Sequence, residues 1–105
     1  ESTGSSLGAE LSREQSRSWA DRRVREGIAR ARAGNQAGAL DCYQAALELC
    51  PRHQQALVGR GAALVNVGRP SEGLRDFDRV LKLDPEDVNA RKYREIAEKR
   101  VREGA

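Results

Sequence analysis

The most reactive side chains in this chain are one histidine and two cysteines. Cys50 and His53 have the Cys-x-x-His spacing found in zinc sites, but a structural zinc ion needs about four ligands, and Cys42 is the only other soft candidate. His53 follows Pro51 closely, and the sequence places no serine, cysteine or acid to form a proton relay with it. We therefore predict no catalytic site, no metal and no cofactor, and we interpret His53 as a surface turn residue.

The two cysteines do not form a disulfide with each other. The pattern around Cys42 and Cys50 predicts one helix, in which their Cα atoms are roughly 12 Å apart, beyond the reach of a disulfide. The chain has no signal-peptide pattern and no apolar run long enough to span a bilayer. We expect an intracellular protein, cytoplasmic or nuclear, with no membrane partner. Because the chain starts at Glu1 and contains no methionine, we interpret it as a fragment of a longer protein.

The net charge of +3 and the pI of about 9.2 raise the question of a nucleic-acid partner. The charges are mixed along the chain, with 19 Lys and Arg against 16 Asp and Glu, and no segment forms a basic arm. RNA binding is an alternative that rests on the run Arg91-Lys92-Tyr93-Arg94, with Trp19 and Tyr93 as the aromatic side chains available to stack on bases. A charge run on a helix is usually a solvated face, so we favour that interpretation.

Hydrophobic periodicity predicts an all-helical chain. Ser12 and Gln15 have the spacing of a capping box, and apolar residues recur at helical intervals from there to Gly34. Residues 1–11 have no such period, so we predict a disordered tail there, in which the run 2–6 resembles a cloning remnant. Further helices are predicted at residues 37–49, 54–67, 70–83 and 87–103, with Gly68 and the pair Asp84-Pro85 as stops.

An internal repeat of 34 residues organises these helices, because the segment Leu47-Glu48-Leu49-Cys50-Pro51 returns as Leu81-Lys82-Leu83-Asp84-Pro85. The same shift relates small residues to small residues and an aromatic to an aromatic. The related positions are Gly27 with Gly61, Gly34 with Gly68, Ala39 with Gly73, Tyr43 with Phe77, Ala46 with Val80 and Pro51 with Pro85. A period of this length is typical of stacked helical hairpins.

These positions resemble the signature of tetratricopeptide repeats, in which small residues stand where two helices cross, an aromatic lies in the second helix and a proline follows it. The resemblance covers about residues 20–103, with one repeat over 20–53, a second over 54–87 and a last helix over 87–103. It implies an all-α, right-handed helical solenoid of two helix-turn-helix hairpins plus a C-terminal capping helix, as one domain over residues 12–103.

Two departures from the family pattern affect packing. Gly73 replaces the usual alanine, at a helix-interior cost of about 1 kcal/mol. Glu95 stands where Gly27 and Gly61 stand in the earlier units, so it cannot admit another close helix. We interpret the last helix as a polar cap, and a truncated third repeat stays open as the alternative.

The resemblance implies a non-enzymatic protein-interaction module or scaffold. In the family, the first helices of successive repeats line a concave groove that holds a peptide. That groove maps here onto Val24, Arg25, Ile28, Arg32, Val58, Ala62, Val65, Asn66, Lys92, Tyr93 and Ile96. We expect an apolar floor and a rim in which Arg25, Arg32 and Lys92 select acidic side chains. The alternative is that the valines pack between helices and the arginines are only solvated.

Two further hypotheses concern partners. Some co-chaperones of the family grip the free carboxylate tail of heat-shock chaperones with Lys and Asn, but Val24, Ile28 and Gly59 hold those places here, so the resemblance does not extend to that clamp. Self-association is the other alternative, with Trp19 as the contact at an open end of the stack. We favour a monomer.

Overall fold

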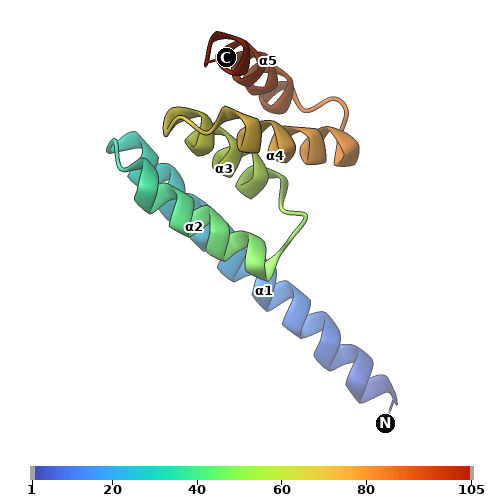
Figure 1. Cartoon of the computed structure of the whole chain (residues 1–105). Helices are drawn as coiled ribbons and strands as arrows, with labels where there is room; N and C mark the ends of the chain where they lie inside the picture. The colour runs from blue at the N-terminus through green and yellow to red at the C-terminus, as the bar shows by residue number, and fades with distance from the viewer. Residues whose placement is uncertain (1, 105) are drawn as a thin grey trace.

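Five α-helices make up the protein, as the computed structural model in Figure 1 shows. The structure describes the backbone of residues 2–104 and the side chains of residues 13–104. The helices are α1 (Ser2–Arg32), α2 (Gln36–Leu49), α3 (Gln54–Asn66), α4 (Pro70–Leu83) and α5 (Val88–Gly104). No strand occurs among residues 2–104, so the predicted all-α class is confirmed.

Neighbouring helices pack in chain order to form a helical solenoid. α1 packs with α2 and α3 packs with α4 as two antiparallel hairpins, while contacts of α2 with α3 and of α4 with α5 join the successive units (Figure 1). α1 also contacts α3, and α3 contacts α5. The first helices of the units, α1, α3 and α5, therefore form one face, and α2 and α4 form the opposite face. This is the predicted arrangement of two hairpins plus a last helix.

Local sequence signals set the helix ends. Gly34 and Gly68, which follow α1 and α3, have φ angles of 85° and 87°, in the left-handed region that glycine enters without a steric penalty. The Asn35 side chain accepts a hydrogen bond from the Gly38 N–H at 2.9 Å and caps α2. Pro70 begins α4, where its missing N–H leaves no helical hydrogen bond unmade. The two predicted glycine stops are confirmed.

The first helix begins earlier than the sequence predicts. Its backbone is helical from Ser2, so Ser12 lies inside the helix and does not begin it. The intervening sequence contains no proline, the residue that most strongly ends a helix. This part of α1 extends beyond the hairpin that α1 forms with α2 (Figure 1). The side chains of residues 1–11 lie outside the described part of the structure. The disordered tail predicted for these residues therefore stays a prediction.

The two repeats bury their aromatic side chains in equivalent places. The Tyr43 ring lies against Gly27 of α1 and Gly59 of α3, where an added Cβ would come within 2.7 Å and 2.6 Å of the ring. The Phe77 ring lies in the same way against Gly61, where an added Cβ would be 2.6 Å away. Both rings are almost fully buried. A side chain at any of these glycines would overlap a ring, which explains why glycine stands there.

The remaining signature positions take structural roles in both units. Ala39, Ala46 and Val80 are fully buried between helices. Pro51 and Pro85 are exposed in the turns that follow α2 and α4. The small residues let the helix axes approach closely, and the prolines stop the second helix of each unit.

The departure at Gly73 has a packing reason. A Cβ there would lie 2.7 Å from the carbonyl oxygen of Gly61 and 3.1 Å from a methyl group of Val65. The backbones of α3 and α4 thus come closer at this crossing than an alanine allows. The close packing of α3 on α4 offsets the stability that a glycine costs inside a helix.

His53 is buried, which corrects the interpretation that it is a surface residue. Its Nδ1 accepts a hydrogen bond from the Ala56 N–H at 3.3 Å and so caps α3. Because Nδ1 is an acceptor, the proton of the neutral ring is on Nε2, which donates to Asp21 Oδ1 of α1 at 2.6 Å. The sequence places His53 correctly in the turn after Pro51, but it does not show that α1 covers this turn.

α5 presents charges where α3 presents its packing face. One repeat length relates Leu57, Gly61, Leu64 and Val65 of α3 to Arg91, Glu95, Glu98 and Lys99 of α5. Glu95 is exposed, whereas the equivalent Gly61 is covered by a ring. α5 buries Ala90 and Ala97 instead, on the side that faces the second unit. α5 therefore has a polar outer face, as expected for a cap, and a truncated third repeat stays open as the alternative.

Candidate functional site

The face formed by α1, α3 and α5 carries a groove of about 630 Å³. Its floor is apolar and includes Ile28, Val58 and Tyr93, one residue from each of the three helices. Side-chain amides and three charged side chains surround the floor. The full lining is Ile28, Ala31, Arg32, Gln36, Tyr43, Gln54, Gln55, Val58, Gly59, Ala62, Ala63, Asn66, Asp84, Asp87, Asn89 and Tyr93.

Part of the predicted residue set lies in this groove. The members that line it are Ile28, Arg32, Val58, Ala62, Asn66 and Tyr93. Val58, Ala62 and Asn66 follow one another at intervals of one helical turn, which places them in a single stripe along α3. The structure therefore brings together predicted residues from the first helix of each unit.

The other predicted residues lie elsewhere. Val24 and Val65 are 1% and 5% exposed and belong to the core, so for them the alternative of packing between helices is correct. Arg25, Lys92 and Ile96 are exposed but do not line the groove. Neighbouring stripes on a helix are separated by about one residue in the sequence, so a periodic pattern alone does not tell the groove side from the adjoining core side.

Sequence reasoning missed the two acidic residues of the groove, Asp84 and Asp87, and two of its amide residues, Gln36 and Gln54. Asp84 and Asp87 come from the turn between α4 and α5, and Gln36 is the first residue of α2. Arg32 is the only basic side chain among the described lining residues, so a rim of mixed charge replaces the predicted basic rim. The Asp84-Pro85 turn could have indicated the two acidic residues. This turn leads into α5, so it ends beside the face that α1, α3 and α5 form.

Local hydrogen bonds hold the two carboxylates in the groove wall. Asp84 Oδ1 accepts from the Glu86 N–H at 3.1 Å, and its Oδ2 accepts from Gln54 Nε2 at 3.4 Å. Asp87 Oδ1 accepts from the Ala90 N–H at 2.9 Å and caps α5. Each carboxylate retains lone pairs beyond these bonds, so both can accept hydrogen bonds from a ligand.

One polar atom of the groove wall lacks a partner. Gln36 Oε1 is buried and makes no hydrogen bond to the described residues. A buried acceptor in this state costs about 1–3 kcal/mol. A donor that a ligand brings to this wall, such as a peptide N–H, would remove that cost once the Gln36 side chain turns toward it.

Two tyrosines form rigid parts of the floor. Burial raises the pKa of the Tyr43 phenol, so this side chain is neutral at physiological pH and offers an apolar ring. Tyr93 is half-buried and stacks on Phe77, with ring centroids 6.1 Å apart. Rings held by packing on both sides give contact area at a small entropic cost.

The described part of the chain offers no site for a metal ion and no helix suited to a membrane. Within residues 13–104, no group of three or more His, Cys, Asp or Glu side chains is placed to hold a metal ion. Over the same residues, no helix combines the length and the apolar character that crossing a membrane requires. Cys42 is buried and Cys50 half-buried, both as thiols. The groove side chains offer hydrogen bonds, apolar contact and charge.

No protein-family model matches the chain. The chain is, however, 36% identical over 83 residues to tetratricopeptide repeat protein 14 of Mus musculus. This similarity suggests a tetratricopeptide-like chain. The matched segment covers 79% of this chain but 11% of the relative, so the chain spans a small part of the relative's length.

A tetratricopeptide-like stack accounts for the extent of the groove. One repeat length relates Ile28 to Ala62 and Ala62 to Ile96. The first two line the groove, but Ile96 does not. α5 is the last helix that the structure describes, and Ile96 has no wall opposite it among the described residues.

Proposed function

We propose that the chain is a set of tetratricopeptide repeats that binds a peptide segment of another protein in the groove between α1, α3 and α5. The observation that carries this proposal is an apolar floor surrounded by side-chain amides, which are Gln36, Gln54, Gln55, Asn66 and Asn89. An amide both donates and accepts hydrogen bonds, which suits the alternating N–H and C=O groups of a peptide backbone. The role is binding and not catalysis.

The rim charges define the peptide further. Arg32 ends α1, while Asp84 and Asp87 stand in the turn before α5. We propose a peptide with an acidic side chain near Arg32 and a basic side chain near the two carboxylates, separated by an apolar side chain over Val58. This peptide of mixed charge replaces the acidic peptide that the sequence predicted.

The RNA alternative gains no support from the same region. Arg91 bonds to Glu86 and to the Pro85 carbonyl oxygen, and Arg94 is 2.8 Å from Asp78. Tyr93 is half-buried in its stack with Phe77. The basic run is therefore partly neutralised, and its aromatic ring is used in packing.

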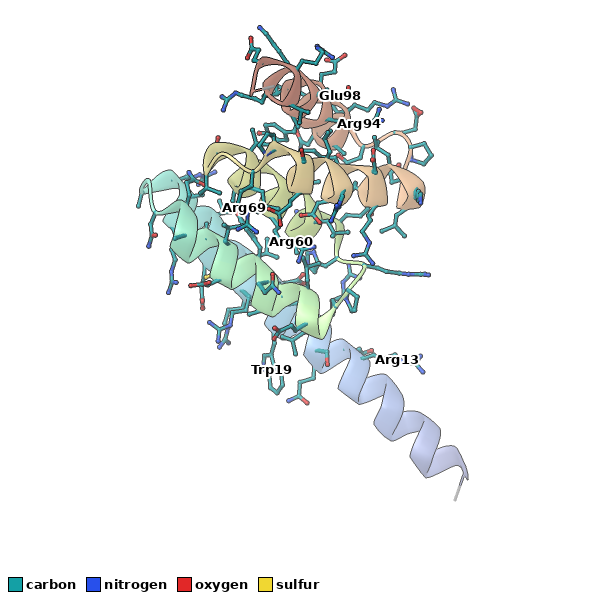
Figure 2. All side chains as sticks on the ribbon, viewed as in Figure 1. Arg13, Trp19, Arg60, Arg69, Arg94 and Glu98 are labelled. Carbon is teal, nitrogen blue, oxygen red and sulfur yellow. The ribbon has the colours of Figure 1, made fainter. Side chains whose placement is uncertain are left out.

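Self-association rests on Trp19, which is 49% exposed on α1 (Figure 2). Single exposed apolar side chains are common on monomeric proteins. Sedimentation at several protein concentrations tests this alternative, and a monomer at every concentration would contradict it.

Peptide selection followed by a matched pair of substitutions tests the groove. Random peptides displayed on phage are selected on the intact chain, and the binding of a selected peptide is measured by fluorescence polarisation. Val58→Lys places a charge on the groove floor, so we expect about tenfold weaker binding or more. Val67→Lys is the control, because Val67 is an exposed valine at the end of α3 that does not line the groove.

Two results would contradict the proposal. One is that no peptide is enriched on the wild-type chain. The other is that the Val58 and Val67 variants bind the selected peptides equally well. Circular dichroism of both variants shows that the fold is retained.

A further inference from the structure

The face opposite the groove carries a second hollow, between α2 and α4. No Cα atom of α2 lies within 8 Å of a Cα atom of α4, and a cleft of about 690 Å³ lies between the two helices. Leu40 and Leu64 form its apolar floor, and Leu64 is almost fully buried. A smaller hollow of about 170 Å³ shares Gln44, Arg60 and Arg79 with the first. The two together make one elongated cleft along α2 and α4.

Part of the charge in this cleft is already paired. Arg60 donates from Nε and Nη2 to the two carboxylate oxygens of Asp76, at 2.9 Å and 2.7 Å, and from Nη1 to Gln44 at 3.3 Å. Arg69 likewise donates from Nε and Nη2 to the two carboxylate oxygens of Glu72. Both arginines lie along the gap between α2 and α4 in Figure 2. The pair of Arg60 with Asp76 holds the side chains in the middle of the cleft, and the pair of Arg69 with Glu72 holds those at one end.

The remaining charges divide the cleft into two walls of opposite sign. Arg75 and Arg79 stand one turn apart on α4, and Asp41 and Glu48 stand two turns apart on α2. All four are exposed, and within residues 13–104 none of them has an oppositely charged atom within 4.0 Å. Arg75 is near enough to Glu72 to help lower the pKa of that carboxyl, after the larger effect of Arg69. The walls do not neutralise each other because the cleft keeps them apart.

We propose that this outer cleft is a second binding surface, for a protein segment that carries one apolar side chain between an acidic and a basic side. The apolar side chain covers Leu40 and Leu64, carboxylates face Arg75 and Arg79, and a basic side chain faces Asp41 and Glu48. Exposed charge pairs contribute little affinity one by one, so the apolar floor supplies the binding energy and the two walls set orientation and specificity. A segment of a single charge would match one wall and be repelled by the other.

Three synthetic peptides test the charge pattern, and each carries one leucine between two charged flanks. One carries glutamate on one flank and lysine on the other, the second carries glutamate on both flanks, and the third carries lysine on both. We expect the mixed peptide to bind the wild-type chain most tightly in fluorescence polarisation. Leu40 and Leu64 methyl resonances should shift on its addition, because they mark the cleft floor.

Two charge-reversal variants make the preference change in opposite directions. Arg75→Glu with Arg79→Glu makes both walls acidic, so the lysine peptide should become the tightest ligand, by about tenfold. Asp41→Lys with Glu48→Lys makes both walls basic, so the glutamate peptide should become the tightest. Arg75→Gln with Arg79→Gln removes charge without adding repulsion inside α4, and should abolish the advantage of the mixed peptide over the lysine peptide.

The controls separate this cleft from the groove and from general electrostatics. Arg22→Glu with Arg102→Glu changes the net charge equally at exposed positions outside the cleft, and should leave the order of the peptides unchanged. Val58→Lys, on the groove floor, should also leave it unchanged. The proposal is overturned if the order does not follow the wall charges, or if none of the peptides shifts the floor resonances. Either result leaves the groove proposal standing.

Discussion

Tyr93 of α5 stacks on Phe77 of α4, with the ring centroids 6.1 Å apart and the ring planes at 25°. One repeat length earlier, the place of Tyr93 is taken by Gly59, and the Tyr43 ring lies directly against it. Where the first unit meets α3, the Tyr43 ring therefore packs on Gly59. Where the second unit meets α5, the rings of Phe77 and Tyr93 stack on each other instead. The extra ring covers Phe77 on the side that faces α5.

Loss of this second ring should destabilise the C-terminal unit. Tyr93→Ala removes the stack and part of the cover over Phe77, so we expect the free energy of unfolding to fall by about 2 kcal/mol. Urea denaturation followed by circular dichroism measures this change. Tyr93→Phe keeps the ring and is the control, with an expected change below about 0.5 kcal/mol. Equal stability of the alanine variant and the wild type would show that the stack is not a stabilising contact.

Gly73 allows two opposing effects to be compared. Gly73→Ala should gain about 1 kcal/mol of helix propensity, but its Cβ would lie 2.7 Å from the Gly61 carbonyl oxygen. Overpacking of this kind costs about 1–3 kcal/mol, so we expect a net loss of stability in thermal unfolding. Ser71→Ala, at an exposed position of the same helix, should not lose stability. A more stable Gly73→Ala variant would mean that α3 and α4 can separate at this crossing without loss.

The sequence predicts the contacts that depend on residue size and repeat. Gly27 and Gly61 recur at one repeat length, and each receives an aromatic ring that recurs at the same interval. Such contacts follow from the period, because a ring needs a position without a side chain opposite it. The helix stop predicted at Gly34 also recurs, at Gly68, and both glycines have the positive φ angle that such a stop requires.

The contacts that depend on distant or unique residues could not be predicted in this way. Asp84 and Asp87 line the groove because the turn between α4 and α5 passes beside it, and the bond of His53 to Asp21 joins the turn before α3 to α1. Neither has a counterpart one repeat away. Val24 is one turn from Ile28 and one repeat length from Val58, which both line the groove, yet it is buried in the core. The period alone does not distinguish these two environments.

The ion pair of Arg60 with Asp76 should be sensitive to the loss of one partner. Asp76 is 3% exposed, and its carboxylate accepts two hydrogen bonds from Arg60, which raise the pKa of Arg60 above its usual value. Arg60→Met would leave a buried carboxylate without its partner, so we expect a loss of about 3 kcal/mol in urea unfolding. The double variant Arg60→Met with Asp76→Leu should recover most of that loss.

The repeat supplies a matched control for this pair. Arg94 corresponds to Arg60 one repeat later, but it pairs with Asp78, and both of these side chains are more than 40% exposed. Arg94→Met should therefore change the free energy of unfolding by about 1 kcal/mol or less. Equal losses for Arg60→Met and Arg94→Met would contradict the view that burial decides the cost.

The bond between Asp21 and His53 should give stability a specific pH dependence. The hydrogen bond from His53 lowers the pKa of Asp21 below its ordinary value of 3.8. A carboxyl whose folded pKa is depressed stabilises the fold above its unfolded pKa, and this contribution is lost as the pH falls through the folded pKa. Asp21→Asn keeps an acceptor for His53 but removes the charge, so the variant should be less stable than the wild type at neutral pH. The two should become equally stable at a pH below the folded pKa, where the wild-type carboxyl is itself protonated.

Urea denaturation at a series of pH values between neutral and strongly acidic measures this difference. Asp41→Asn is the control, because Asp41 is exposed and makes no ion pair within residues 13–104, and its variant should differ little from the wild type at any pH. If the deficit of Asp21→Asn persisted unchanged at the lowest pH, the charge of Asp21 would not be its cause. The hydrogen bond geometry at His53 would then carry the whole effect, and the connection between α1 and the turn before α3 would be independent of pH.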